Sequence, residues 1–105
     1  KIKSKISTYN KKVLVNVKQL DTFIKNKNYK NSLLKIDVEG NELRVLLGSK
    51  TIMKNFKYIF FEHKFITNKD NKSKIFNLLR KNNFILKNKV STFPYHFTDY
   101  LFQKK

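Results

Sequence analysis

The chain has no cysteine and only two glycines among its 105 residues. Without cysteine it can form neither a disulfide framework nor a thiolate metal site or nucleophile. It has no run of about 18 apolar residues, so no transmembrane helix is predicted. No pattern typical of a signal peptide follows Lys1. We therefore expect a truncated or processed start and a cytoplasmic location.

Acidic residues are also scarce. The chain has 7 of them against 24 basic residues, which gives a net charge of +17. Of the basic residues 22 are Lys, spread along the chain, whereas base readout and bidentate phosphate recognition favour Arg. Together with 13 Asn they make up a third of the sequence, as an A-rich coding bias would produce. We expect no specific nucleic-acid partner. The alternative is a non-catalytic basic module, or a degenerate remnant, that contacts polyanions.

Apolar residues make up 40% of the chain and predict a single domain of strands and helices. A short helix capped by Asp21 is predicted, a second short helix begins near Leu43, and a longer one begins near Asn71. The predicted strands cover residues 13–20, 32–38, 58–62, 84–90 and 99–102. The run at 32–38 is apolar almost without alternation, as in a strand covered on both faces. The last two strands can pair antiparallel, so an α/β layered sheet with an antiparallel edge is expected.

Four of the seven carboxylates lie at or just beyond the ends of the two most apolar strands, namely Asp37, Glu39, Glu42 and Glu62. Ligands of open α/β sheets bind outside the carboxyl ends of the strands. We therefore expect these side chains to crowd one rim of the sheet, together with His63. A general base or a hydroxyl-binding group is the natural use of such a rim.

Structural roles compete with function at several of these positions. Glu39 and Glu42 flank the start of a helix, where a carboxylate can cap N–H groups, and we prefer this role for Glu42. Function is preferred for Asp37, because an acid in an apolar run costs free energy unless it faces the strand-end crevice. Gly40 fits a tight strand-to-helix turn whatever the activity. Gly48 stands where a helix cap belongs.

The two histidines carry less information. His63 adjoins a strand and His96 stands in a loop, and each can equally be an ordinary surface residue. Metal-assisted hydrolysis by Asp37, Glu39 and Glu62 would lack the spaced His ligands that are usual for zinc. We therefore predict no metal site.

Two segments carry a resemblance to a known family. They are Val-Lys-Gln-Leu-Asp-Thr-Phe-Ile at 17–24 and Leu-Leu-Lys-Ile-Asp-Val-Glu-Gly-Asn-Glu-Leu-Arg-Val-Leu-Leu-Gly at 33–48. Together they resemble the signature of FkbM-type methyltransferases, and later pieces follow in the same order, so that the resemblance covers about residues 13–103. The resemblance implies that residues 1–105 are a single partial domain. Its fold would be the C-terminal half of a Rossmann-like methyltransferase, a mostly parallel sheet with an antiparallel C-terminal edge hairpin.

The resemblance also implies an activity. Such enzymes transfer a methyl group from S-adenosylmethionine, often to a hydroxyl of a sugar or small natural product. By the family's pattern Asp37 and Glu39 would be catalytic, Asp37 would also contact the cofactor, and Glu62 and His63 would bind the small-molecule or glycan acceptor. The family's glycine-rich cofactor loop has no counterpart here. The expected partner is therefore a missing N-terminal half, and we expect the chain alone to be inactive and not to bind the cofactor.

Overall fold

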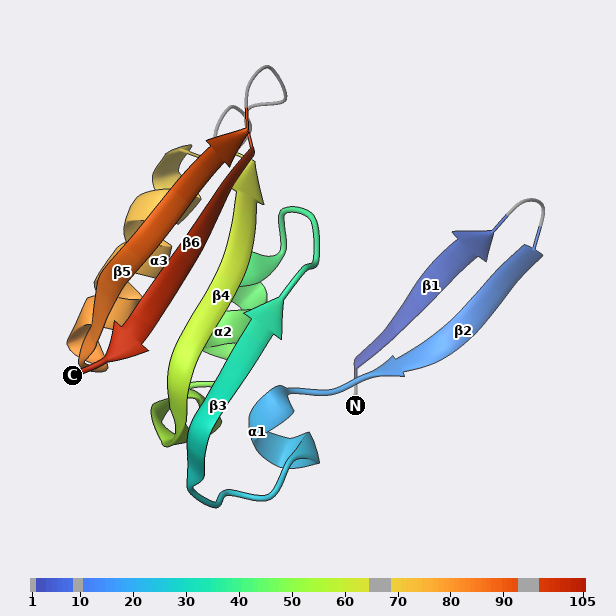
Figure 1. The fold of residues 1–105 in the computed structure, drawn as a ribbon. Coiled ribbons are helices and arrows are strands. Elements are labelled where there is room, and N and C mark those ends of the chain that lie inside the picture. Colours follow the sequence, from blue (N-terminus) through green and yellow to red (C-terminus); the bar gives the residue numbers. More distant parts are fainter. Residues whose placement is uncertain (1, 9–10, 65–68, 93–96) are drawn as a thin grey trace.

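The computed structural model describes residues 2–8, 11–64, 69–92 and 97–105. Strands and helices alternate through most of the chain (Figure 1). In chain order the elements are β1 (Ile2–Thr8), β2 (Lys11–Val17), α1 (Leu20–Phe23), β3 (Tyr29–Ile36), α2 (Glu42–Leu47), the 3₁₀ helix η1 (Ile52–Asn55), β4 (Phe56–Lys64), α3 (Lys69–Lys81), β5 (Phe84–Thr92) and β6 (Phe97–Lys104).

The main sheet has four strands in the order β3-β4-β6-β5. β3 and β4 are parallel, while β6 runs antiparallel to both of its neighbours, β4 and β5. The predicted α/β class and the antiparallel pairing of the last two strands are confirmed. The sheet is mixed rather than mostly parallel, because only one of its pairings is parallel. The observed sheet differs from the predicted one because β6 lies between β4 and β5.

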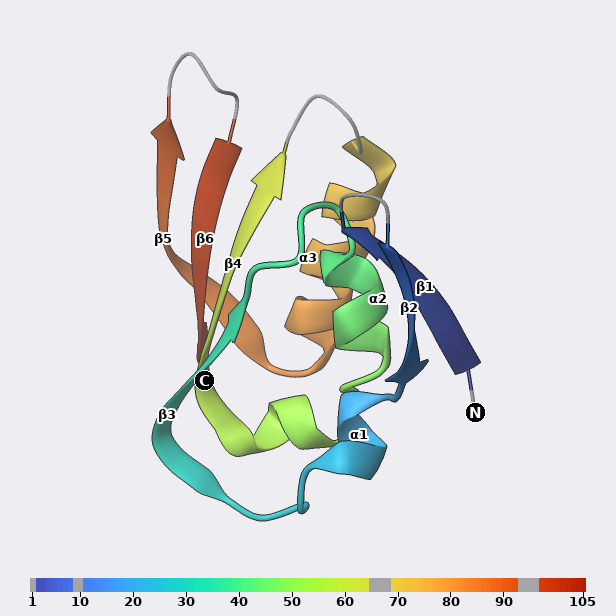
Figure 2. The same ribbon diagram turned by 90° about the vertical axis from the view of Figure 1, so that its right-hand side faces the viewer.

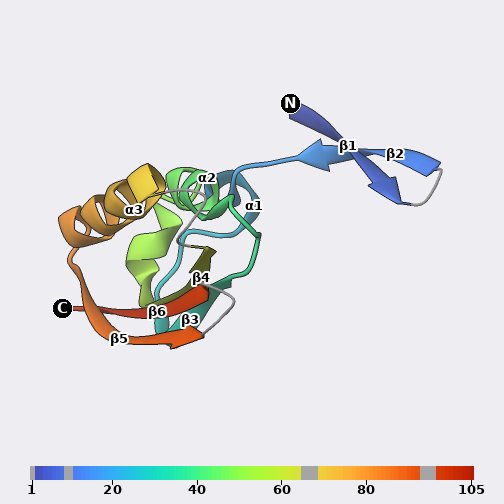
Figure 3. The same cartoon turned by 90° about the horizontal axis from the view of Figure 1, so that it is seen from above.

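The helices of the described residues all lie on one face of this sheet (Figure 3). The side chains of β4 alternate accordingly, with Ile59 and Phe61 fully buried and Phe60 between them only half-buried. The prediction that the strand near 32–38 is covered on both faces is wrong, since Leu33 on β3 is 50% exposed. β3 is an edge strand with one covered face.

The core lies between the sheet and the helices. Its aromatic centre consists of Phe61, Phe102 and Tyr100, with Phe61 stacked on Phe102 at a ring-centroid distance of 5.9 Å. Phe76 of α3 packs edge-on against Tyr100 and Phe102. Aromatic pairs in these geometries stabilise a core beyond the area that they bury. The remaining buried members are Ile36, Leu46, Met53, Ile59, Ile75, Leu79 and Phe84.

The N-terminal strands form a separate two-stranded sheet. β1 and β2 pair antiparallel, from Ile2 opposite Val17 to Thr8 opposite Lys11, and the hairpin extends away from the α/β body (Figures 1 and 3). The prediction that the first strand belongs to the layered sheet is therefore wrong. The alternating apolar residues on β2 were the basis for it, yet Val13 is 56% exposed.

Asp21 has a different role from the predicted cap of its own helix. It lies inside α1, and its carboxylate accepts hydrogen bonds from the backbone N–H groups of Thr51 and Ile52, the latter at 2.8 Å. These are N–H groups at the start of η1, which have no partner within that helix. Asp21 therefore fixes α1 against η1, and Figure 2 shows the two short helices side by side.

Candidate functional site

Four carboxylates lie near one another where β3 and β4 end, at the edge toward which both arrows point in Figure 1. Asp37 follows the last residue of β3, and Glu39 stands in the loop that leads to α2. Glu62, near the end of β4, lies directly opposite Asp99 on β6. We refer to Asp37, Glu39, Glu62 and Asp99 as the carboxylate cluster. The predicted gathering of acids at this rim thus includes three predicted residues and one further residue.

The electrostatics of Glu62 reflect this arrangement. Burial raises the pKa of Glu62 above its usual range, and the negative charges of Asp99 and Asp37 raise it further. A side-chain hydrogen bond with Asp99 and the charge of Glu39 add to this shift. A carboxyl with a raised pKa is a better proton acceptor near neutral pH than an ordinary carboxylate. Glu62 is therefore suited to accept a proton at this edge of the sheet.

Glu42 and His63 lie on the other side of β4, under the helix layer. Each side chain is only 2% exposed, and the Glu42 Oε2 atom lies 3.9 Å from His63 Nδ1. His63 follows Glu62 directly, and neighbouring residues of a strand point to opposite faces. Acceptor binding by His63 stays a prediction. The structure places its side chain beside Glu42 and not among the exposed carboxylates of the rim.

Glu42 also differs from a simple helix cap. Its Oε1 atom accepts a hydrogen bond of 3.1 Å from the backbone N–H of Gly40, which precedes α2. The Asn41 side chain, at the N-cap position, makes no capping hydrogen bond. Glu42 therefore closes the turn between β3 and α2. The structural role predicted for Glu42 is therefore to hold this turn.

The two glycines serve the backbone. Gly40 has a φ of +95°, a left-handed conformation that suits glycine and fits the predicted tight turn. Gly48 ends α2, as predicted, and its carbonyl accepts a hydrogen bond from the Asp21 N–H. A Cβ on Gly40 would meet nothing within 4 Å, and one on Gly48 would make ordinary contacts. The two glycines stand apart in the sequence and do not together form a glycine-rich loop.

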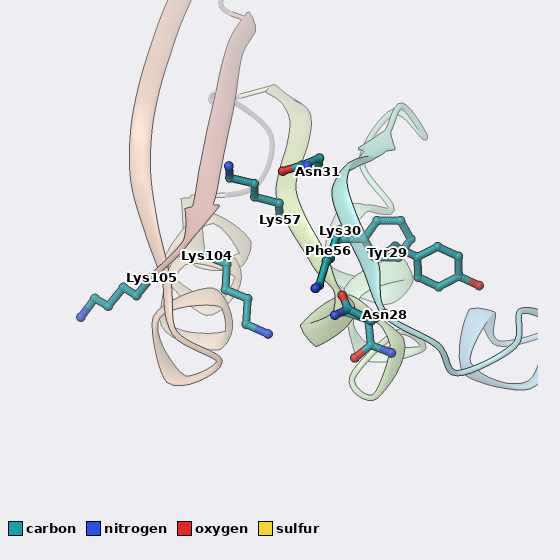
Figure 4. Close-up of a pocket in the computed structure, with 9 residues that line it drawn as sticks. Asn28, Tyr29, Lys30, Asn31, Phe56, Lys57, Lys104 and Lys105 are labelled. Carbon is teal, nitrogen blue, oxygen red and sulfur yellow. The ribbon is translucent and has the colours of Figure 1, made fainter.

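A basic pocket lies at the opposite edge of the sheet (Figure 4). It has a volume of about 300 Å³, and its lining includes Lys30, Lys57, Lys104 and Lys105. The ammonium of Lys104 donates a hydrogen bond to the Lys54 carbonyl. In Figure 4 the side chains of Lys57 and Lys105 extend in different directions. Because the ammonium groups do not converge, this pocket is not a built anion site.

Within residues 2–8, 11–64, 69–92 and 97–105, no group of three or more His, Asp or Glu side chains has an arrangement that could hold a metal ion. None of the helices in the same ranges is long and apolar enough to cross a membrane. His96, considered above as a candidate, lies outside the described residues.

Residues 1–86 match the protein family described as Methyltransferase FkbM domain. The chain belongs to this family. The match spans β1 to the start of β5, and it therefore includes every member of the carboxylate cluster except Asp99. Comparison with curated proteins and with solved structures gave no match.

Membership of the FkbM methyltransferase family confirms the resemblance drawn from the motifs at 17–24 and 33–48. Asp99 is the cluster residue that sequence reasoning did not select. Its sequence signal was its place at the start of the last predicted strand, but that strand was expected to pair only with its predecessor. Its second pairing, with β4, places Asp99 opposite Glu62.

Proposed function

We propose that this FkbM-family chain is part of an S-adenosylmethionine-dependent methyltransferase that methylates a hydroxyl group of a sugar or small natural product. The observation that carries the proposal is the carboxylate cluster at the end of β3 and β4. Ligands bind at this edge in open α/β sheets. The family supplies the reaction type.

S-adenosylmethionine, when bound, supplies an electrophilic methyl group on a positively charged sulfonium. Asp37 is the residue proposed to contact this cofactor, and the negative charge of the cluster complements a cation. The two glycines of the chain stand apart and do not form the glycine-rich loop that such a cofactor requires. We therefore propose that the cofactor's glycine-rich loop belongs to a segment outside these residues, and that this chain is the C-terminal part of the complete catalytic domain.

The acceptor hydroxyl is proposed to lie against the exposed carboxylates Asp37 and Glu39. For methyl transfer the acceptor oxygen must be held in line with the methyl group, and a carboxylate that accepts its proton orients it. Glu62, whose pKa is raised, is suited to accept the hydroxyl proton and pass it on.

The test is transfer of labelled methyl from S-adenosylmethionine to a panel of sugars and small hydroxyl compounds by the form of the protein that carries the donor-binding loop. The expected product is a methyl ether that survives alkali, which distinguishes it from a methyl ester. Matched acceptors in which the reacting hydroxyl is replaced by hydrogen should receive no label. Transfer only to nitrogen or carboxylate acceptors would contradict the proposal.

A further inference from the structure

We infer that Glu42 and His63 form a positioning pair that holds the loop at residues 37–41, and thereby keeps Asp37 and Glu39 beside Glu62. The inference rests on the proposed function in that the loop carries the proposed catalytic carboxylates. The pair itself is recognised by contacts within the chain. Neither Glu42 nor His63 needs to touch the cofactor or the acceptor.

Glu42 uses its two carboxylate oxygens for two different parts of the fold. Oε1 accepts the hydrogen bond from Gly40 N–H at 3.1 Å, inside the loop. Oε2 lies 3.9 Å from Nδ1 of His63, on the central strand β4. The carboxylate therefore connects the loop to a strand that is fixed by neighbours on both sides.

The burial of the pair argues for more than an ordinary cap. A carboxylate at the start of a helix is stabilised by the helix dipole even when it is exposed to water. Glu42 is instead 2% exposed, and burial of a carboxylate costs free energy unless its oxygens have partners. The Gly40 N–H of the loop satisfies one oxygen of the carboxylate, and the His63 imidazole on the strand packs against the other at 3.9 Å, so the carboxylate lies between the loop and the strand.

The loop needs such support because its backbone conformation is unfavourable. Glu39 has a φ of +41° and Gly40 a φ of +95°. A left-handed conformation at a residue with a side chain persists only when the surroundings hold it. The hydrogen bond from Gly40 to Glu42 lies directly after Glu39 and supplies that hold.

β4 links this support to the carboxylate cluster. Glu62 and His63 are consecutive, with Glu62 half-buried and His63 buried under the helices. The charges of Asp37 and Glu39 act on Glu62, so the loop lies close to the end of β4, while Glu42 reaches His63 from the helix side. Glu42 and His63 thus hold the loop from the helix side of β4. Asp37 and Glu39 of the same loop lie toward Glu62, on the other side of the strand.

The experiment titrates the Glu62 side-chain carboxyl of the 105-residue chain by NMR and measures hydrogen exchange at the Gly40 amide. In Glu42→Leu the loop loses its anchor. We expect the Gly40 amide to exchange at least about tenfold faster, and the pKa of Glu62 to fall toward its usual value as Asp37 and Glu39 move away. Glu42→Gln keeps an acceptor for Gly40 and should restore most of both properties.

Asp21→Ala is the matched control, because it removes another carboxylate with backbone hydrogen bonds, at a site that holds η1. It should destabilise the chain without changing the Glu62 titration. If Glu42→Leu does not fold, His63→Gln carries the test, since it removes the imidazole and should still speed exchange at Gly40. Unchanged exchange and titration in whichever of these variants folds would overturn the inference. No donor or acceptor is present in this experiment, so a failure of the proposed methyl transfer would leave the result standing.

Discussion

Glu62 and Asp99 lie directly opposite one another on the antiparallel strands β4 and β6. Burial and the nearby negative charges, that of Asp99 foremost among them, raise the pKa of Glu62. Glu62 therefore holds a proton more tightly than an isolated glutamate would.

Glu62→Gln should change how the stability of the chain depends on pH. A carboxyl whose pKa is higher in the folded state binds more protons when folded, so its contribution to stability is complete below the unfolded pKa and is lost as pH rises through the folded pKa. The stability of Glu62→Gln, relative to that of the native chain, should therefore be higher at pH 7 than at pH 4. The measurement is the urea midpoint of both proteins at the two pH values.

A second variant, Asp99→Asn, tests the effect of Asp99 on the pKa of Glu62. It removes the charge that most strongly opposes ionisation of Glu62, so the pKa of Glu62 should fall, as followed by NMR of its side-chain carboxyl. The stability of this variant should also depend less on pH than the stability of the native chain does. A Glu62 titration that is the same with and without the Asp99 charge would show that the two carboxyls do not interact.

Asp21→Ala should destabilise the fold, because the backbone N–H groups of Thr51 and Ile52 lose their acceptor. We expect a cost of about 1–2 kcal/mol, the usual effect of removing a helix-capping side chain. Asp21→Asn keeps one acceptor oxygen and should cost less. Equilibrium urea unfolding measures both, and equal stability of all three proteins would argue against a role for Asp21 in fixing η1.

The 105-residue chain alone should not bind S-adenosylmethionine with a dissociation constant below about 1 mM. The physical reason is that the chain's two glycines, Gly40 and Gly48, are isolated and form no glycine-rich loop around the donor. Isothermal titration calorimetry at high protein concentration is the measurement. Binding in the micromolar range would mean that the carboxylate cluster and its surroundings suffice for a donor site.

Binding of the chain to nucleic acid should be weak and independent of sequence. Its lysines are dispersed, and the ammonium groups at the basic pocket do not converge. Fluorescence anisotropy with two unrelated duplexes should give equal affinities, which fall steeply as salt rises from about 50 to 200 mM. A preference for one duplex at physiological salt would favour the alternative of a nucleic-acid-binding module.

Sequence reasoning predicted the α/β body well because its strands and helices carry distinct periodicities. The helix beginning near Asn71 is α3, and the strand predicted over 32–38 overlaps β3. It did not predict the hairpin of β1 and β2, because alternating apolar residues on β2 look the same whether they join a large sheet or a separate ribbon. Strand order depends on contacts between distant segments, and a local pattern does not contain it.

The same distinction applies to the candidate site. The position of Asp37 and Glu62 at strand ends is a local property, and their proximity at one edge follows from parallel pairing. The pairing of Glu42 with His63 depends on which face of β4 each residue meets, and it became visible only with the helix layer in place. Asp99 was missed for a similar reason, since its contact with Glu62 requires β6 to lie beside β4.

The central claim is that the carboxylates at the end of β3 and β4 serve methyl transfer. The most direct measurement is the rate of labelled-methyl transfer by the donor-binding form of the protein, compared between the native sequence, Asp37→Asn and the control Asp21→Asn. Asp37→Asn keeps the shape of the side chain and removes its charge, so the rate should fall by about two orders of magnitude, while Asp21→Asn should keep most of it. Native rates in a folded Asp37→Asn variant would contradict the account.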